Sequence, residues 1–277
     1  MSIDLTTKFQ PYVDEQFSEE SKRSLLTNQD FDWTGAHTVK VYKVGTSEMN
    51  DYDRNGTNLR WSRYGAVKDL DATTEEMTLK KDRSFTFVID KLDQDETQNQ
   101  LAAASALARQ NREVVIPEVD AYTYGVMAQN AGEKPAAKAL TAENIYDEII
   151  AGTEALDNAK VPEAGRILVI TPAANRMLKK NPEVSIETSI GDELRKLGAI
   201  GILDGMTVVK VSASVLPEGF GFMIAHPVAT VAPVKLEDYT IHENPPGISG
   251  SLVEGRICYD AFVLDNKAKA IYYQATA

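Results

Sequence analysis

The sequence predicts an α+β protein. Residues 38–44 and 77–91 alternate apolar and polar side chains, which is typical of β-strands. Residues 98–112 are rich in Ala, Leu, Gln and Arg, and these residues favour helix. Strands and short helices alternate between residues 166 and 225, and β-structure is predicted again from residue 234 to residue 274.

Residues 1–34 are predicted to be a polar arm with scattered apolar residues. Ser18 is a candidate N-cap for a short helix that runs to about Leu26. The arm contains three Phe, one Tyr and one Trp, so we expect it to pack against another surface. The alternative is a frayed terminus.

The strands at residues 38–44 and 77–91 are predicted to be the two arms of a long hairpin. Asn55-Gly56 is a turn signal between them. Arms of ~15 residues would reach about 50 Å at ~3.3 Å per residue. Because an isolated two-stranded ribbon is marginal in water, we expect this hairpin to lean on another surface. The alternative is that it folds back onto its own domain as part of a meander.

Two helices are predicted next. The first covers residues 98–112, and its apolar spacing resumes at Val115 and continues to Val126, with a kink or break expected at Pro117. The second covers residues 142–156 and has Thr141 as its N-cap.

The rest of the chain is predicted as a small α/β unit followed by a terminal β-hairpin. In the α/β unit a buried strand is followed by a helix that begins with Pro172, and a further helical turn is expected at residues 192–197. The predicted strands of this part are residues 166–171, 206–212, 221–225, 234–242, 252–264 and 268–274, with a turn at residues 265–267 before the last.

Composition excludes several classes of protein. The chain has 277 residues, 43% of them hydrophobic, and a net charge of −12, so it is neither disordered nor a dedicated nucleic-acid binder. It has one cysteine, no stretch long enough to span a bilayer and no apparent signal peptide, so we expect a soluble protein made in a cytoplasm. The charge is uneven: residues 38–92 carry 10 basic and 9 acidic side chains, whereas residues 1–34 carry 3 and 7.

A search for chemistry finds no catalytic, cofactor or metal motif. The histidines His37, His226 and His242 are far apart, and none is near Cys258 in the sequence. Cys258 lies inside a predicted strand and is interpreted as a buried apolar residue. The acidic residues are interpreted as solvated charge, and Asn50–Asp53 lacks the ligand spacing of a calcium loop. We therefore predict that the chain is not an enzyme.

The order of the elements resembles the major capsid proteins of tailed bacteriophages, which have the Hong Kong 97-type fold. The resemblance covers residues 36–274, although no single motif is diagnostic. The stretches that carry it are Ala108-Arg-Gln-Asn-Arg-Glu-Val-Val-Ile-Pro-Glu-Val-Asp-Ala-Tyr122, Gly165-Arg-Ile-Leu-Val-Ile-Thr-Pro172, Leu203-Asp-Gly-Met-Thr-Val-Val-Lys-Val211, Gly255-Arg-Ile-Cys-Tyr-Asp-Ala-Phe-Val-Leu264 and Ala270-Ile-Tyr-Tyr273.

The resemblance implies a division of the chain into five parts. These are an N-terminal arm (1–37), an extended β-hairpin loop or E-loop (38–92), a P domain with a long spine helix (93–135), a mixed α/β A domain (136–232) and P-domain return strands (233–277).

The resemblance also implies a function. The chain would assemble with itself, as hexamers and pentamers, into an icosahedral shell that encloses double-stranded DNA without binding it specifically. It would be located in the virion capsid, be assembled in the bacterial host cytoplasm, need no cofactor and contact no membrane. A separate scaffolding protein is expected because the arm is short, and a portal and decoration proteins are expected as further partners. Lys68 lies near the hairpin tip, but we predict no covalent cross-link there.

The expected sites are therefore contacts between subunits. The resemblance implies that the arm, residues 1–34, adds contacts that become ordered only on assembly. Basic residues of the hairpin would meet acidic residues of a neighbour, and two aromatic residues would anchor the contact, unless they pack under their own loop. The candidates are Arg54, Arg60, Trp61, Arg63, Tyr64 and Lys68 on the hairpin, and Asp93, Asp95 and Glu96 on the neighbour.

Two alternatives remain open from the sequence. An encapsulin-like nanocompartment shares the fold but encloses an enzyme cargo, so the contents of purified shells would distinguish it. A cytosolic α/β enzyme with a cryptic carboxylate site is the other, and turnover by a monomer would favour it.

Overall fold

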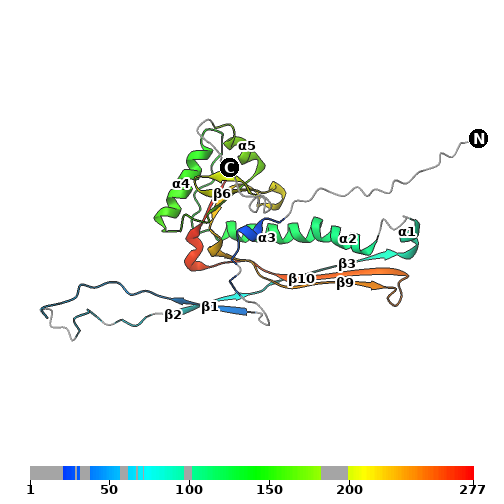
Figure 1. The fold of residues 1–277 in the computed structure, drawn as a ribbon, viewed down its shortest axis with the longest axis horizontal. Coiled ribbons are helices and arrows are strands. Elements are labelled where there is room, and N and C mark those ends of the chain that lie inside the picture. Colours follow the sequence, from blue (N-terminus) through cyan, green and yellow to red (C-terminus); the bar gives the residue numbers. More distant parts are fainter. Residues whose placement is uncertain are drawn as a thin grey trace, which may run out of the picture. The chain divides into compact units, whose positions relative to one another are not determined.

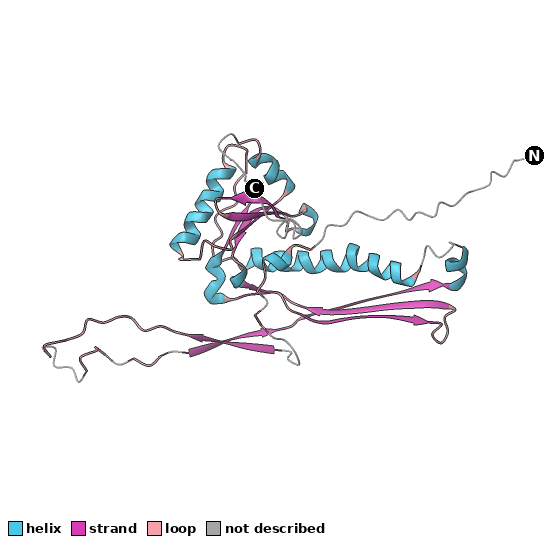
Figure 2. Ribbon diagram, in the orientation of Figure 1, coloured by secondary structure: helices cyan, strands magenta, loops and turns pink. Residues whose placement is uncertain are grey.

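The computed structural model describes residues 21–28, 30–31, 38–56, 62–66, 68–70, 72–96, 102–181 and 199–277. The chain divides into two compact units. One comprises Trp33–Leu79, and the other comprises Met1–Asp32 with Lys80–Ala277. Figure 1 labels the elements, and Figure 2 shows the helices and strands of each unit.

The smaller unit is built on one antiparallel pair of strands, β1 (Thr38–Val44) and β2 (Ala72–Thr78). Their register pairs Thr38 with Thr78, and the two threonine Oγ1 atoms are 2.9 Å apart. In β1 the side chains of Val39, Val41 and Lys43 are half-buried, whereas those between them are exposed, as the alternation predicted.

The larger unit begins with a three-stranded antiparallel sheet in the order β3-β10-β9. Each of these strands has ten residues, and Figure 1 shows them running together for most of their length. Their bounds are Lys81–Asp90 for β3, Val234–Glu243 for β9 and Gly250–Tyr259 for β10.

A long helix lies against this sheet. It consists of α2 (Ala103–Gln110), one π-helical turn (Asn111–Val115) and α3 (Ile116–Gln129) without interruption. Val115 and Val119 of the helix pack on Ile257 and Tyr259 of β10. Of the kink or break predicted at Pro117, the break is therefore wrong: helical structure continues through the proline, and the π-helical turn lies directly before it.

The larger unit also contains a five-stranded sheet in the order β12-β7-β4-β6-β5. Its inner strands read as continuous apolar runs because helices cover both faces. Helices α4 (Ile145–Asn158) and α5 (Pro172–Leu178) pack on one face. The end of α3 packs on the other face, through Tyr124 and Met127. The strands are β4 (Ile167–Ile170), β5 (Ala199–Leu203), β6 (Met206–Lys210), β7 (Phe220–Ala225) and β12 (Ile271–Ala275).

Short elements complete this unit. Helix α1 (Lys91–Glu96) follows β3, and strands β8 (Thr230–Val231) and β11 (Phe262–Val263) pair with each other. The 3-10 helices are Arg23–Leu25, Ala213–Val215, Pro227–Ala229 and Asp265–Ala270.

Two strand predictions need correction. The predicted arm at residues 77–91 is two strands: β2 pairs with β1, whereas β3 pairs with β10 of the other unit. The segment 80–92, which we expected within the extended loop, thus belongs to the larger unit. The predicted terminal hairpin is also wrong, because β10 ends at Tyr259 and the last strand, β12, pairs with β7 in the five-stranded sheet.

The expectation that the whole arm becomes ordered only on assembly is wrong for residues 21–28. Leu26 is fully buried in the core cluster that contains Tyr124 and Met127. Ser21 donates a hydrogen bond of 2.8 Å to Asp120, and the backbone N–H of Asn28 donates to the carbonyl of Thr230 at 2.7 Å. The predicted N-cap Ser18 and the predicted helical turn at residues 192–197 lie outside the described residues.

Candidate inter-subunit interface

The distal part of the smaller unit presents two tyrosines side by side. The rings of Tyr52 and Tyr64 meet edge to face, with centroids 5.0 Å apart, and Tyr64 is 78% exposed. The backbone N–H of Asp53 donates to the carbonyl of Arg63 at 2.9 Å, which holds the two segments together. The exposed aromatic pair is an apolar surface that a partner can cover.

Only some of the predicted basic residues can be placed near this pair of tyrosines. Arg63 donates a hydrogen bond of 3.4 Å to the carbonyl of Arg54, so these two residues and Tyr64 come together. Lys68 lies 3.6 Å from Glu48 in an exposed ion pair, which is a weak interaction in water. Arg60 and Trp61 lie outside the described residues.

Exposed apolar side chains are concentrated in the smaller unit. Six of the twelve large exposed hydrophobic residues of the described part belong to it: Tyr42, Val44, Met49, Tyr52, Tyr64 and Leu70. Met49 is the most exposed of them, at 97%. Of these six residues, sequence reasoning named only Tyr64 as an interface candidate, since it considered residues 50–56 as a turn and a possible calcium loop. The sequence did contain a signal, because these apolar residues occur among the mainly polar residues 42–70.

The predicted acidic partner surface lies at one end of the three-stranded sheet. Helix α1 carries Asp93 and Asp95, both exposed, whereas the side chain of Glu96 is not described. The backbone N–H of Lys91 donates to the carbonyl of Ser249 at 3.0 Å, which ties α1 to the turn between β9 and β10. Leu92 is 67% exposed beside these carboxylates, so this end combines an apolar side chain with negative charge.

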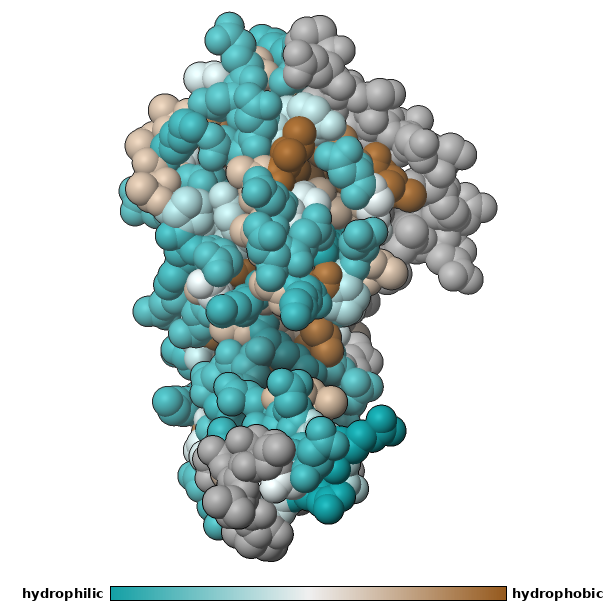
Figure 3. Space-filling view, turned by 90° about the vertical axis from the view of Figure 1, so that its left-hand side faces the viewer, coloured by the Kyte–Doolittle hydropathy of each residue, from teal (hydrophilic) through white to brown (hydrophobic). Residues whose placement is uncertain are grey.

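The face drawn in Figure 3 is predominantly hydrophilic, with small separate hydrophobic patches. No helix within the described ranges combines the length and the apolarity needed to cross a membrane.

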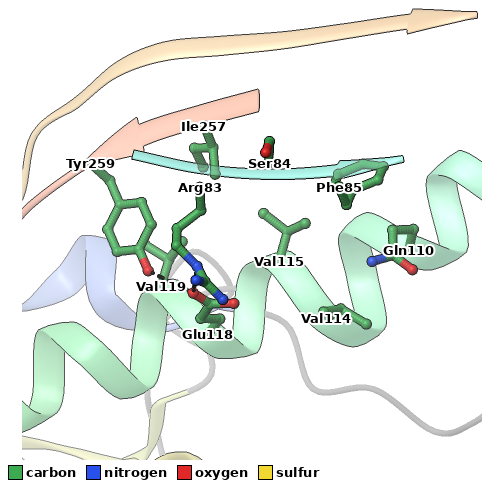
Figure 4. Close-up of a pocket in the computed structure, with 10 residues that line it drawn as sticks. All are labelled: Arg83, Ser84, Phe85, Gln110, Val114, Val115, Glu118, Val119, Ile257 and Tyr259. Carbon is green, nitrogen blue, oxygen red and sulfur yellow. Dashed lines mark hydrogen bonds and ion pairs between the residues drawn. The ribbon is translucent and has the colours of Figure 1, made fainter. Parts of the chain in front are cut away.

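A small cavity lies between the long helix and the three-stranded sheet, and the residues around it hold these two elements together. It has a volume of about 130 Å³ and is lined mainly by apolar side chains (Figure 4). At its edge Glu118 accepts hydrogen bonds from Arg83 at 2.8 Å and from Tyr259 at 3.2 Å. Burial and the neighbouring Glu118 raise the pKa of Tyr259 to about 12, so Tyr259 is a neutral donor at physiological pH.

The histidines and the cysteine do not converge among the described residues. His226 contacts the carbonyl of Ala164 at 3.1 Å and accepts from the backbone N–H of Val228. His242 pairs with Glu254 at 3.3 Å on the sheet, and Cys258 is half-buried in β10. No group of three or more potential metal ligands occurs in the described ranges.

Comparisons with solved structures identify the fold. A structure from Mycobacterium phage Che8 matches with a TM-score of 0.69 and 19% sequence identity, over 99% of this chain and 98% of that chain. The capsid structure of the cyanophage P-SCSP1u matches with a TM-score of 0.73 and 15% identity, over 99% and 93% of the two chains. The chain has the fold of a tailed-phage capsid protein.

A virus-like particle protein is also similar in structure to this chain. The crystal structure of a virus-like particle from Pyrococcus furiosus matches with a TM-score of 0.56 and 12% identity, over 92% of each chain. No family model matches the sequence. No curated protein matches it either.

Proposed function

We propose that this chain is a major capsid protein that assembles with copies of itself into an icosahedral shell around double-stranded DNA. The observation that carries the proposal is the smaller unit, Trp33–Leu79. Its described strands are one two-stranded ribbon, which is marginal alone in water, and half of the large exposed apolar side chains of the described part lie on this unit. Copies of the chain would cover these side chains in a shell, which supports a structural role rather than an enzymatic one.

Each part of the chain would correspond to one domain of the capsid fold. The smaller unit would be the extended loop, ending at Leu79, and the three-stranded sheet with the long helix would be the P domain. The five-stranded sheet would form the A domain, which β12 would then join. The arm would begin from a fixed point at residues 21–28, and its remainder would contact other subunits.

The extended loop would contact a neighbouring copy through the residues named above. Arg54, Arg63 and Tyr64 form one cluster on the loop, and Asp93 and Asp95 stand exposed at the end of the sheet. Opposite charges at such a contact favour correct register more than they add affinity. We keep Arg60, Trp61, Lys68 and Glu96 as further candidates for the same contact.

Shells formed in this way would be located in the virion and assembled in the host cytoplasm. A separate scaffolding protein, a portal and decoration proteins would be the other partners, and the enclosed DNA would not be bound specifically. The acidic balance of −12 supports the last point, because negative walls repel duplex DNA.

Sedimentation velocity of the purified protein tests this function. We expect fast-sedimenting closed particles under assembly conditions, and particles from producing cells should contain duplex DNA protected from nuclease. A protein that stays at 30.4 kDa under every condition would contradict the proposal. Closed particles with protein cargo and no DNA would instead favour the encapsulin-like alternative.

A further inference from the structure

The first part of the long helix has little packed against it. Five of the eight residues of α2 are Ala or Leu, yet none of the eight is buried, whereas six of the fourteen residues of α3 are buried. Most of the stability of a helix in a protein comes from packing an apolar face against other segments. Helix α2 thus offers a surface that a further segment of chain can cover.

One row of exposed residues runs along this helix toward α3. Successive members are four residues apart, so they lie close to one face of the helix. They are Ala104, Ala108, Arg112 and Ile116. The next residue at this interval is Asp120, and its Oδ1 atom accepts a hydrogen bond of 2.8 Å from the hydroxyl of Ser21, the first described residue of the arm. The arm therefore joins the helix at the end of the exposed row.

The start of the described arm is held at this point. The Nε atom of Arg23 lies 3.5 Å from the Asp120 carboxylate, and Leu26 is fully buried. Residues 1–20 thus extend from a fixed origin. The row from Asp120 to Ala104 is about 24 Å long at ~1.5 Å per residue, and twenty residues cover about 30 Å even as a helix. The segment is therefore long enough to cover the row.

The composition of residues 1–20 matches this row. Three of the apolar side chains are spaced four residues apart, as on one face of a helix. They are Phe9, Val13 and Phe17. Pro11 would stand in the first turn of such a helix, where proline is tolerated. The segment carries one basic and five acidic side chains, a net charge of −4, whereas residues 102–117 carry two basic and one acidic, a net charge of +1. The apolar spacing and the opposite charge both favour a contact with this face.

We propose that residues 1–20 dock on the exposed row of their own chain, with the Phe17 side chain toward Ile116 and acidic side chains toward Arg112. Docking would shield Ile116, which is 37% exposed, from water and would place opposite charges beside each other. The inference goes beyond the proposed function, since a single subunit makes this contact before any shell forms. The outward side of the docked segment stays available for contacts with other subunits.

Photochemical cross-linking in unassembled subunits tests the docking. Benzoylphenylalanine in place of Phe17 should cross-link to the peptide that contains Arg112 and Ile116, as located by mass spectrometry. The same group in place of Gln16 is the matched control, because the adjacent position points to another side of a helix, and it should give a several-fold lower yield. In an equal mixture of isotopically light and heavy chains, every product should be purely light or purely heavy, because the contact lies within one chain.

Two substitutions on the helix complete the test. Arg112→Glu should lower the yield from the Phe17 position by about fivefold at low salt, because it replaces an exposed attraction by a repulsion. Val114→Ser alters a side chain that is 46% exposed but lies off the row, so it should leave the yield unchanged. Circular dichroism checks that both variants are folded.

Three outcomes would overturn the proposal. Products that join light to heavy chains would show that the segment binds a second copy instead. Equal yields from positions 16 and 17, or an unchanged yield in Arg112→Glu, would show that the segment does not dock on this face. These measurements use single subunits, so they can fail while shells still form, and they can succeed when the sedimentation test of the proposed function fails.

Discussion

Arg256 of β10 and Asp82 of β3 form a bidentate ion pair. The guanidinium donates to the two carboxylate oxygens at 2.9 and 2.6 Å. The hydrogen bond and charge of Arg256 hold the pKa of Asp82 below its ordinary value of 3.8. A carboxyl group whose pKa is lower in the folded state than in the unfolded state stabilises the folded state at any pH above its unfolded-state pKa. This stabilisation is lost as the pH falls through the lower, folded-state pKa, so the contribution of Asp82 is present at pH 7.

We therefore expect Asp82→Asn to lower the melting temperature slightly at neutral pH. The difference from wild type should shrink as the pH falls below 3.8, and added salt should reduce it because both side chains are about half exposed. Thermal unfolding followed by circular dichroism measures this. A difference that is the same at pH 7 and in acid would show that packing, not charge, is responsible.

Two glycines near the end of the long helix form a matched pair. A Cβ atom on Gly132 would lie 2.5 Å from backbone atoms of Ala268 and Lys269, whereas a Cβ atom on Gly125 would have no neighbour within 4 Å. We expect Gly132→Ala to destabilise the fold by ~1–3 kcal/mol, since the backbone must shift. Gly125→Ala should stabilise it by ~0.5–1 kcal/mol, since alanine favours helix. Denaturant unfolding measures both, and equal effects would contradict the packing around Gly132.

At the scale of elements, the sequence predicted local structure well and partnerships poorly. Periodicity located β1, α4, α5 and four strands of the five-stranded sheet (β4, β6, β7 and β12) because each pattern lies within one short segment, whereas β5 was not predicted. It joined β2 to β3 because no Gly or Pro separates Thr78 from Lys81. The pairing of β3 with β10 depends on contacts between residues far apart in the chain, which a local pattern does not contain. The buried side chain of Asp260 accepts hydrogen bonds from the backbone N–H of Lys80 and the hydroxyl of Tyr122, which are 180 and 138 residues away, and the sequence did not indicate these contacts for the same reason.

Deletion of residues 50–76 tests the independence of the larger unit. Three core clusters of described residues contain no residue from this range, so we expect a folded subunit that forms no closed shells. Circular dichroism and sedimentation measure the two properties. Loss of the helix and sheet signals on deletion would show that the loop belongs to the core.

At the scale of the whole molecule, charge would guide the loop onto its neighbour. Arg63 is exposed, and Asp93 and Asp95 are exposed on α1. We expect Arg60→Glu combined with Arg63→Glu to weaken assembly more at low salt than at high salt, because salt screens exposed charges. Light scattering during assembly measures this effect.

The matched control reverses the same amount of charge elsewhere. Lys179→Glu combined with Lys180→Glu alters two exposed residues just after α5, outside the smaller unit. This control should assemble normally. Equal defects in the two double variants would assign the effect to net charge, and a defect independent of salt would count against electrostatic docking.

The whole account depends on self-assembly, and electron microscopy of the purified protein tests it most directly. The capsid fold and the loop with its exposed apolar side chains predict hollow polyhedral particles of uniform size. Fields that contain only single subunits or open aggregates, under every assembly condition tried, would contradict it.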